Sequence, residues 1–216
     1  MILAIGDSNL YPACTVSEQA PDPTNMAAVF SDLMGQPFDC WAMNGASNYW
    51  IESHIEYFLA DASWPRDTML FVGWTSVERE EWPWMNKTVA ICGGPDFGKP
   101  GPIKARYEQW RGGLNGRYVR EKTLFWHDRI HAMHRRLLDR GVPHLFWSTY
   151  DNFRGMHEHA YWGRNYYKPY DQTGYMKSFF ESNGIPAYTH DPFHYSPAAH
   201  RAWAQELFDH TQVSQS

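Results

Sequence analysis

The sequence predicts an α/β protein built on a parallel β-sheet, and three observations lead to this prediction. Short apolar runs recur along the 216 residues, most of these runs end in a turn of small residues, and the turns lead into stretches with helical periodicity. Apolar residues make up 43% of the chain and aromatic residues 17%, which is sufficient for the core of one large domain. We therefore expect a single domain over residues 1–216.

The first expected strand leads directly to a candidate nucleophile. Four apolar residues, Ile2 to Ile5, stop at Gly6, Asp7 and Ser8, as a fully buried strand does where it enters a tight turn. Ligands of open α/β sheets bind beyond the carboxyl ends of the strands, so Ser8 would be displayed to a substrate. Gly-Asp-Ser by itself is more often an ordinary turn, in which case Ser8 has no chemical role.

Further strands and helices follow in alternation along the chain. We expect strands at 38–42, 68–72, 142–148 and 185–188, which gives a five-stranded parallel sheet. We expect helices at about 25–34, 50–59, 119–139, 172–183 and 198–210. This order is typical of right-handed βαβ units.

The periodicity breaks down after the third expected strand, over residues 77–118. Prolines and glycines interrupt this insertion, which also carries an unusual number of aromatic residues. A long segment without regular structure in a compact domain is usually disordered or functional, and the aromatic content favours an ordered lid or an interaction surface. The insertion would therefore contact either substrate or a second copy in a homo-oligomer.

Composition excludes several classes of protein. No run approaches the 18 apolar residues that a membrane helix needs, and Met1 leads directly into a strand without a signal peptide, so we expect a cytoplasmic protein. The net charge of -5 hides a basic segment at 99–140, but acidic residues dilute it and we expect no nucleic-acid partner. The odd cysteine count, at Cys14, Cys40 and Cys92, matches no disulfide framework or zinc site and favours a reducing compartment.

Three histidines on the long expected helix could suggest a metal site. His127, His131 and His134 lie at helical spacing along one face, but imidazoles in a row on one helix cannot surround an ion tetrahedrally. We therefore expect no metal and interpret them as packed or surface residues. A nucleotide-binding function is also disfavoured, because no glycine-rich phosphate loop follows any strand.

A second constellation lies near the end of the chain, in the turn after the last expected strand. Asp191 and His194 are three residues apart, so in a turn both side chains can lie on the same side, with the carboxylate orienting the imidazole toward Ser8. The order of these residues along the chain is Ser, Asp, His. His190 is a competitor for the role of base, but its side chain should point away from that of Asp191.

With these residues the sequence resembles the SGNH, or GDSL-type, hydrolase family. Gly6-Asp7-Ser8 is similar to the first family block, Gly45 within Asn44-Gly45-Ala46-Ser47 to the second, and Asp191-Pro192-Phe193-His194 to the DxxH block. The resemblance implies a three-layer α/β/α, flavodoxin-like fold. It also implies hydrolysis of acyl esters, often O-acetyl groups, on carbohydrates or lipids by a Ser8, Asp191 and His194 triad, without metal or organic cofactor.

One block departs from the family. Where the family has Gly-x-Asn-Asp, this chain has Gly73-Trp74-Thr75-Ser76, so Thr75 takes the place of the asparagine in an oxyanion hole formed with the N–H groups of Ser8 and Gly45. A hydroxyl has one hydrogen to donate and reaches less far than a carboxamide. Loss of one hydrogen-bond donor from an oxyanion hole lowers kcat by a factor of about 10²–10³.

Three further residues are candidate substrate contacts, and two of them could compensate for the missing asparagine. Asn44 and Asn48 could supply the missing donor, and we expect both, with Trp74, near the substrate. The Gly-Trp-Thr-Ser block resembles a variant of phage-encoded relatives, which would place the protein in a host cell or virion. The alternative is a protein that keeps the SGNH fold with a weakened or inactive site and acts in binding or assembly.

Overall fold

A parallel sheet of four strands forms the centre of the molecule. The computed structural model describes residues 1–10, 25–84, 87–91, 101–157, 159–188 and 191–212. The sheet has the order β2-β1-β3-β6, and all its neighbours run parallel. Its strands are β1 (Ile2–Gly6), β2 (Phe38–Ala42), β3 (Met69–Trp74) and β6 (His144–Ser148). The predicted α/β class with a parallel sheet is confirmed.

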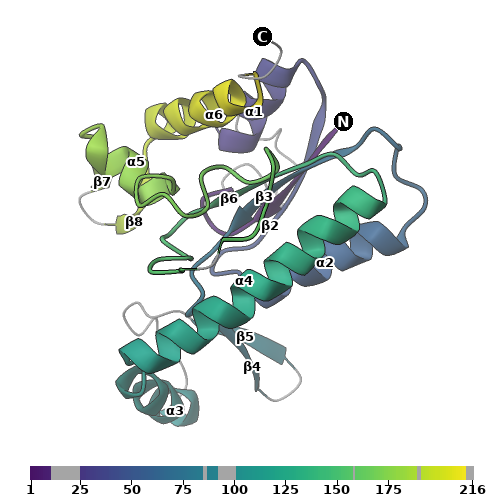
Figure 1. Cartoon of the computed structure of the whole chain (residues 1–216). Helices are drawn as coiled ribbons and strands as arrows, with labels where there is room; N and C mark the ends of the chain where they lie inside the picture. Colours follow the sequence, from purple (N-terminus) through teal and green to yellow (C-terminus); the bar gives the residue numbers. More distant parts are fainter. Residues whose placement is uncertain (11–24, 85–86, 92–100, 158, 189–190, 213–216) are drawn as a thin grey trace.

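Helices cover both faces of this sheet (Figure 1). On one face lie α1 (Met26–Met34) and α6 (Pro197–Gln212), and α2 (Asn48–Ala60) and α4 (Gly116–Asp139) lie on the other. The short helix α5 (Met176–Ser182) packs on the α1 and α6 side. The four long helices begin and end close to the positions that their apolar periodicity predicts.

Alternation along β1 divides the interior into two cores. Ile2 and Ala4 face the core shared with α1 and α6, whereas Leu3 and Ile5 face the core shared with α2 and α4. All four side chains are fully buried. Because both faces of the strand are covered, its sequence is a continuous apolar run, as strands of parallel sheets usually are.

The predicted fifth strand of the parallel sheet is wrong. Residues 187–188 form β7 (Ala187–Tyr188), which pairs antiparallel with β8 (Asp191–Tyr195) in a separate hairpin. The loop after β6 occupies the outer edge of that strand instead. Phe146 donates its N–H to the carbonyl of Asn165 at 2.6 Å and accepts from the N–H of Tyr167 at 2.8 Å. The edge of β6 is thereby satisfied by the chain that follows it.

The insertion is more regular than the sequence indicated. It contains the antiparallel hairpin of β4 (Glu80–Trp84) and β5 (Lys87–Ile91), followed by α3 (Gly101–Gly112) and the first residues of α4. A small core of its own holds these elements together, formed by Trp82, Ile91, Ile103 and Tyr107. Two strands of five residues each, one of them containing Pro83, give too little periodicity to be recognised in the sequence.

In the described part of the chain, no helix has both the length and the apolar character required to span a membrane. Cys40 in β2 is disulfide-bonded, which the irregular spacing of the cysteines did not predict. Cys14 and Cys92 lie outside the described residues.

Candidate functional site

The turns that follow β1 and β3 meet at the carboxyl edge of the sheet. The chain leaves β1 toward β2 on one side and leaves β3 toward β6 on the other, so the strand order reverses between these two strands. Ligands of open α/β sheets bind in the crevice at such a reversal. Ser8 lies in the turn after β1 and Thr75 directly follows β3, so the structure brings these two predicted residues to one edge. Ser8 is buried there, and not displayed as the sequence predicted.

Asp7 holds the turn that carries Ser8. Its Oδ1 accepts hydrogen bonds from the backbone N–H of Asn9 at 3.0 Å and from Asn9 Nδ2 at 3.1 Å. Its Oδ2 accepts from the Thr75 hydroxyl at 2.7 Å and from Arg79 Nη1 at 3.1 Å. The Asp7 carboxylate therefore binds both its own turn and the segment after β3.

Arg79 is a central residue of this site that the sequence analysis did not find. Its side chain is only 10% exposed, and Nη1 donates both to Asp7 Oδ2 and, at 3.2 Å, to the carbonyl of Ala46. The guanidinium carbon also lies 5.8 Å from the centre of the Tyr150 ring. A single arginine in an acidic stretch usually lies on a solvated surface, so nothing in its sequence context indicated burial.

Thr75 and Asn48 bind one another rather than facing an open site. The Thr75 N–H donates to Asn48 Oδ1 at 2.9 Å, and Asn48 Nδ2 donates to the Thr75 carbonyl at 3.1 Å. Both residues are fully buried. The hydroxyl hydrogen of Thr75 is donated to Asp7, and a hydroxyl has only one. In this arrangement Thr75 and Asn48 link the segment after β3 to the start of α2.

The remaining predicted residues of this edge differ in exposure. Asn44 is exposed in the turn after β2, next to Gly45, whose positive φ of 75° favours glycine. Trp74 is buried in the core on the α2 side, where its ring packs edge-on against Phe146 with centroids 5.4 Å apart. As placed, Asn44 is open to solvent, whereas Trp74 is a core residue.

The predicted base lies in a strand and not in a turn. His194 is a partly buried residue of β8, just before α6. The side chain of Asp191 and the whole of His190 lie outside the described part of the structure. The same-side argument made for Asp191 and His194 assumed a turn, so it does not carry over to this extended segment.

Tyr150, in the loop after β6, lies next to Arg79, whose Cζ is 5.8 Å from the centre of its ring. Burial raises the pKa of Tyr150 to about 12; the nearby Arg79 opposes this rise, whereas Asp7 and Tyr195 add to it. The loop after β6 thus reaches the arginine that binds Asp7.

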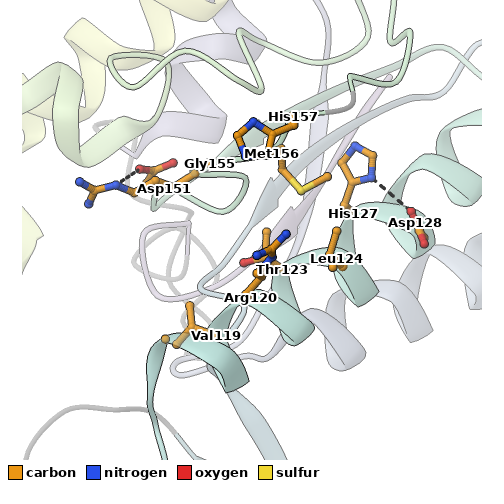
Figure 2. Close-up of a pocket in the computed structure, with 12 residues that line it drawn as sticks. Val119, Arg120, Thr123, Leu124, His127, Asp128, Asp151, Gly155, Met156 and His157 are labelled. Atoms are coloured by element: carbon orange, nitrogen blue, oxygen red, sulfur yellow. Dashed lines mark hydrogen bonds and ion pairs between the residues drawn. The ribbon is translucent and has the colours of Figure 1, made fainter.

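A pocket of about 830 Å³ opens between the first half of α4 and the loop after β6 (Figure 2). Asp151, which follows Tyr150, contributes to its wall and lies 3.8 Å from the guanidinium of Arg154. His127 faces it from α4, and its Nε2 lies 2.7 Å from the Tyr170 hydroxyl. The loop after β6 forms one wall of this pocket and α4 the other. The other lining residues are Gly116, Val119, Arg120, Thr123, Leu124, Asp128, Arg154, Gly155, Met156 and His157.

The three histidines of α4 pack around one tryptophan. The ring centroids of His127, His131 and His134 lie 5.8, 4.9 and 5.4 Å from that of Trp162. His127 also binds Tyr170, and His134 Nδ1 lies 2.8 Å from Nε2 of His144 in β6. Over the described residues, no group of three or more histidine, cysteine or acidic side chains is placed to hold a metal ion.

Comparison with known proteins adds no family assignment. No protein-family model, curated protein or solved structure matches this chain.

Proposed function

We propose that this protein is a serine esterase of the SGNH type with a flavodoxin-like fold. The observation that carries the proposal is the position of Ser8, at the reversal point of a parallel sheet and in a turn fixed by the buried Asp7 carboxylate. The strand order β2-β1-β3-β6 corresponds to the first four strands of the flavodoxin-like order. A nucleophile needs such a rigid support, because small displacements of the attacking atom slow the reaction strongly.

In this proposal His194 removes the proton of the Ser8 hydroxyl as Oγ attacks the ester carbonyl. The role of Asp191 in fixing the imidazole tautomer rests on the resemblance to the SGNH family alone, since both residues lie in the extended strand β8. The N–H groups of Ser8 and Gly45 stabilise the oxyanion. His194 then returns the proton to the departing alcohol, leaving an acyl group on Ser8. Water attacks this acyl group, its proton passes through His194 back to Ser8 Oγ, and the carboxylic acid leaves.

The substrate we propose is an acyl ester, such as an O-acetyl group on a carbohydrate or lipid. The resemblance to the SGNH family supports this substrate class. The pocket between α4 and the loop after β6 does not bear on it, because Ser8, Gly45 and His194 are not among the residues that line that pocket. None of the proposed steps requires a metal or an organic cofactor.

The test is labelling and turnover that depend on Ser8. The wild-type protein and Ser8→Ala are incubated with a fluorophosphonate probe and with p-nitrophenyl acetate, and circular dichroism verifies that both are folded. We expect the wild type to be labelled and to hydrolyse the ester, and Ser8→Ala to do neither. Equal behaviour of the two proteins would refute the proposal.

A second candidate function is binding or assembly on an inactive SGNH-like fold, and one observation favours it. The hydroxyl of Thr75, the residue in place of the oxyanion asparagine, is donated to Asp7 and therefore faces away from a developing oxyanion. This function predicts no Ser8-dependent labelling in a fully folded wild-type protein, so the same experiment separates the two candidates.

A further inference from the structure

We propose that Arg79 is the positioning residue of this site, because it fixes the turn that carries Ser8 relative to the turn that carries Gly45. This inference deepens the proposed esterase function and rests on it for its catalytic consequence. It concerns a residue that lies 72 positions from Asp7 along the chain.

The inference is based on two hydrogen bonds that Arg79 Nη1 donates. Arg79 Nη1 donates to Asp7 Oδ2 at 3.1 Å and to the Ala46 carbonyl at 3.2 Å. Asp7 directly precedes Ser8, and Ala46 directly follows Gly45. The two N–H groups proposed for the oxyanion hole therefore belong to turns that the same guanidinium binds. Changing either contact would change the distance between those two donors.

The surroundings hold Arg79 in this orientation. Its side chain is 10% exposed and that of Asp7 is 1% exposed, so water screens the ion pair little. The Tyr150 ring lies beside the guanidinium, with 5.8 Å between its centre and Cζ. A planar fork with several donors can bind two acceptors at once, whereas the ammonium of lysine is a compact point charge on a more flexible stem.

Arg79 lies near the start of the insertion, just before β4, and attaches this segment to the turns of the site. The Arg79 N–H donates to the Ser76 carbonyl at 3.1 Å, closing the turn that leads into β4. Two residues later, Glu81 accepts a hydrogen bond from the Ser47 hydroxyl at 2.5 Å, at the start of α2. The base of the hairpin is thus attached to the turn after β2 through both residues.

The experiment compares Arg79→Lys and Arg79→Met with the wild type and with Arg129→Met. Arg129 forms a bidentate ion pair with Glu52 between α4 and α2, and is a matched control for loss of an arginine pair. For each folded variant we measure kcat and KM with p-nitrophenyl acetate. Hydrogen exchange is followed by mass spectrometry in peptides that cover residues 2–10 and 42–48.

We expect a loss in kcat with little change in KM. Misplacing a reacting group by about 1 Å costs roughly 10²-fold in rate, so Arg79→Met should lose about 10²-fold in kcat while KM stays within about twofold. Arg79→Lys keeps the charge and should lose about 10-fold. Exchange should accelerate in the two peptides for both Arg79 variants, and Arg129→Met should match the wild type in kcat and in these peptides.

Two results would overturn the inference. One is unchanged exchange in both peptides of a folded Arg79→Met protein, and the other is accelerated exchange spread evenly over the whole sheet. If the wild type shows no Ser8-dependent turnover, the esterase proposal fails, while the exchange data alone still decide whether Arg79 fixes the two turns.

Discussion

Thr75 donates its hydroxyl hydrogen to Asp7 Oδ2 across 2.7 Å, and this bond joins the turns that follow two adjacent strands. Both residues are buried, and the same carboxylate oxygen also accepts from Arg79. Charge-assisted hydrogen bonds of this kind are stronger than neutral ones. The arrangement makes Thr75 a structural partner of the carboxylate beside Ser8.

Thr75→Val should therefore destabilise the protein. Valine has nearly the same shape but no hydroxyl, so the buried Asp7 carboxylate loses one donor. We expect the free energy of unfolding to fall by about 1–3 kcal/mol. Urea denaturation measures this change, and Thr75→Ser, which keeps the hydroxyl, should stay closer to the wild type. A Thr75→Val protein as stable as the wild type would show that this bond contributes nothing.

Gly73 should not tolerate a side chain. A Cβ atom at this position would lie 2.4 Å from a ring carbon of Trp147, which stands beside it in β6. Gly73→Ala should therefore force the buried indole to move and lower the free energy of unfolding by about 1–3 kcal/mol. The control is Gly112→Ala in α3, where a Cβ would meet no atom within 4 Å. Equal midpoints of thermal unfolding for the two variants would contradict this prediction.

Acid should weaken the packing of α4 on β6. His144 Nδ1 lies 2.9 Å from the Val142 carbonyl and must donate to it, so His144 Nε2 accepts from His134 Nδ1 at 2.8 Å. Protonating His144 Nε2 would place two hydrogens between the rings. Burial and the neighbouring His144 lower the pKa of His134 to about 4, and burial also lowers the pKa of His144.

These lowered pKa values set the direction of the pH dependence. The unfolded chain binds a proton at His134 near its ordinary pKa of 6.5, whereas the folded chain does so only near 4. The contribution of neutral His134 to the free energy of unfolding is therefore fully present above pH 6.5. It is lost as the pH falls from 6.5 toward 4, and this loss amounts to about 2–3 kcal/mol. Urea denaturation at several pH values should show that the free energy of unfolding of His134→Leu falls less steeply with decreasing pH than that of the wild type. Equal pH dependence in the two proteins would show that His134 does not cause the loss.

Glu80 should attach the insertion to α4. Its carboxylate accepts hydrogen bonds from Trp82 Nε1 at 2.8 Å and from the Tyr118 hydroxyl, and an ion pair with Lys122 Nζ at 2.9 Å completes the contact. Burial tends to raise the pKa of Glu80, but these hydrogen bonds outweigh it and lower the pKa.

Removing this carboxylate should loosen the insertion without unfolding the sheet. We expect Glu80→Ala to raise the rate of limited proteolysis within residues 77–118 several-fold, because the hairpin loses its polar contacts with α4. Glu108→Ala, on the exposed surface of α3, is the matched control. Cleavage at the wild-type rate would show that the small apolar core around Trp82 holds the hairpin by itself.

The main elements could be predicted because their signals are local. The buried run Ile2–Ile5 and the periodic apolar positions of α1, α2, α4 and α6 identify strands and helices from neighbouring residues alone. The prediction of the fifth strand was wrong because its outcome depends on residues that are distant in the sequence. Whether Ala187–Tyr188 joins the sheet depends on what occupies the edge of β6, and the loop around Tyr166 occupies it.

The parallel α/β architecture and the position of Ser8 beyond its first strand could be predicted from the residues alone, because hydrophobic periodicity acts over a few residues. The surroundings of that serine became known only from the folded chain. Asp7, Thr75 and Arg79 come together across 68 and 72 residues, and no spacing rule relates them. Their contact depends on how turns from different strands meet when the sheet closes, which is a property of the whole fold.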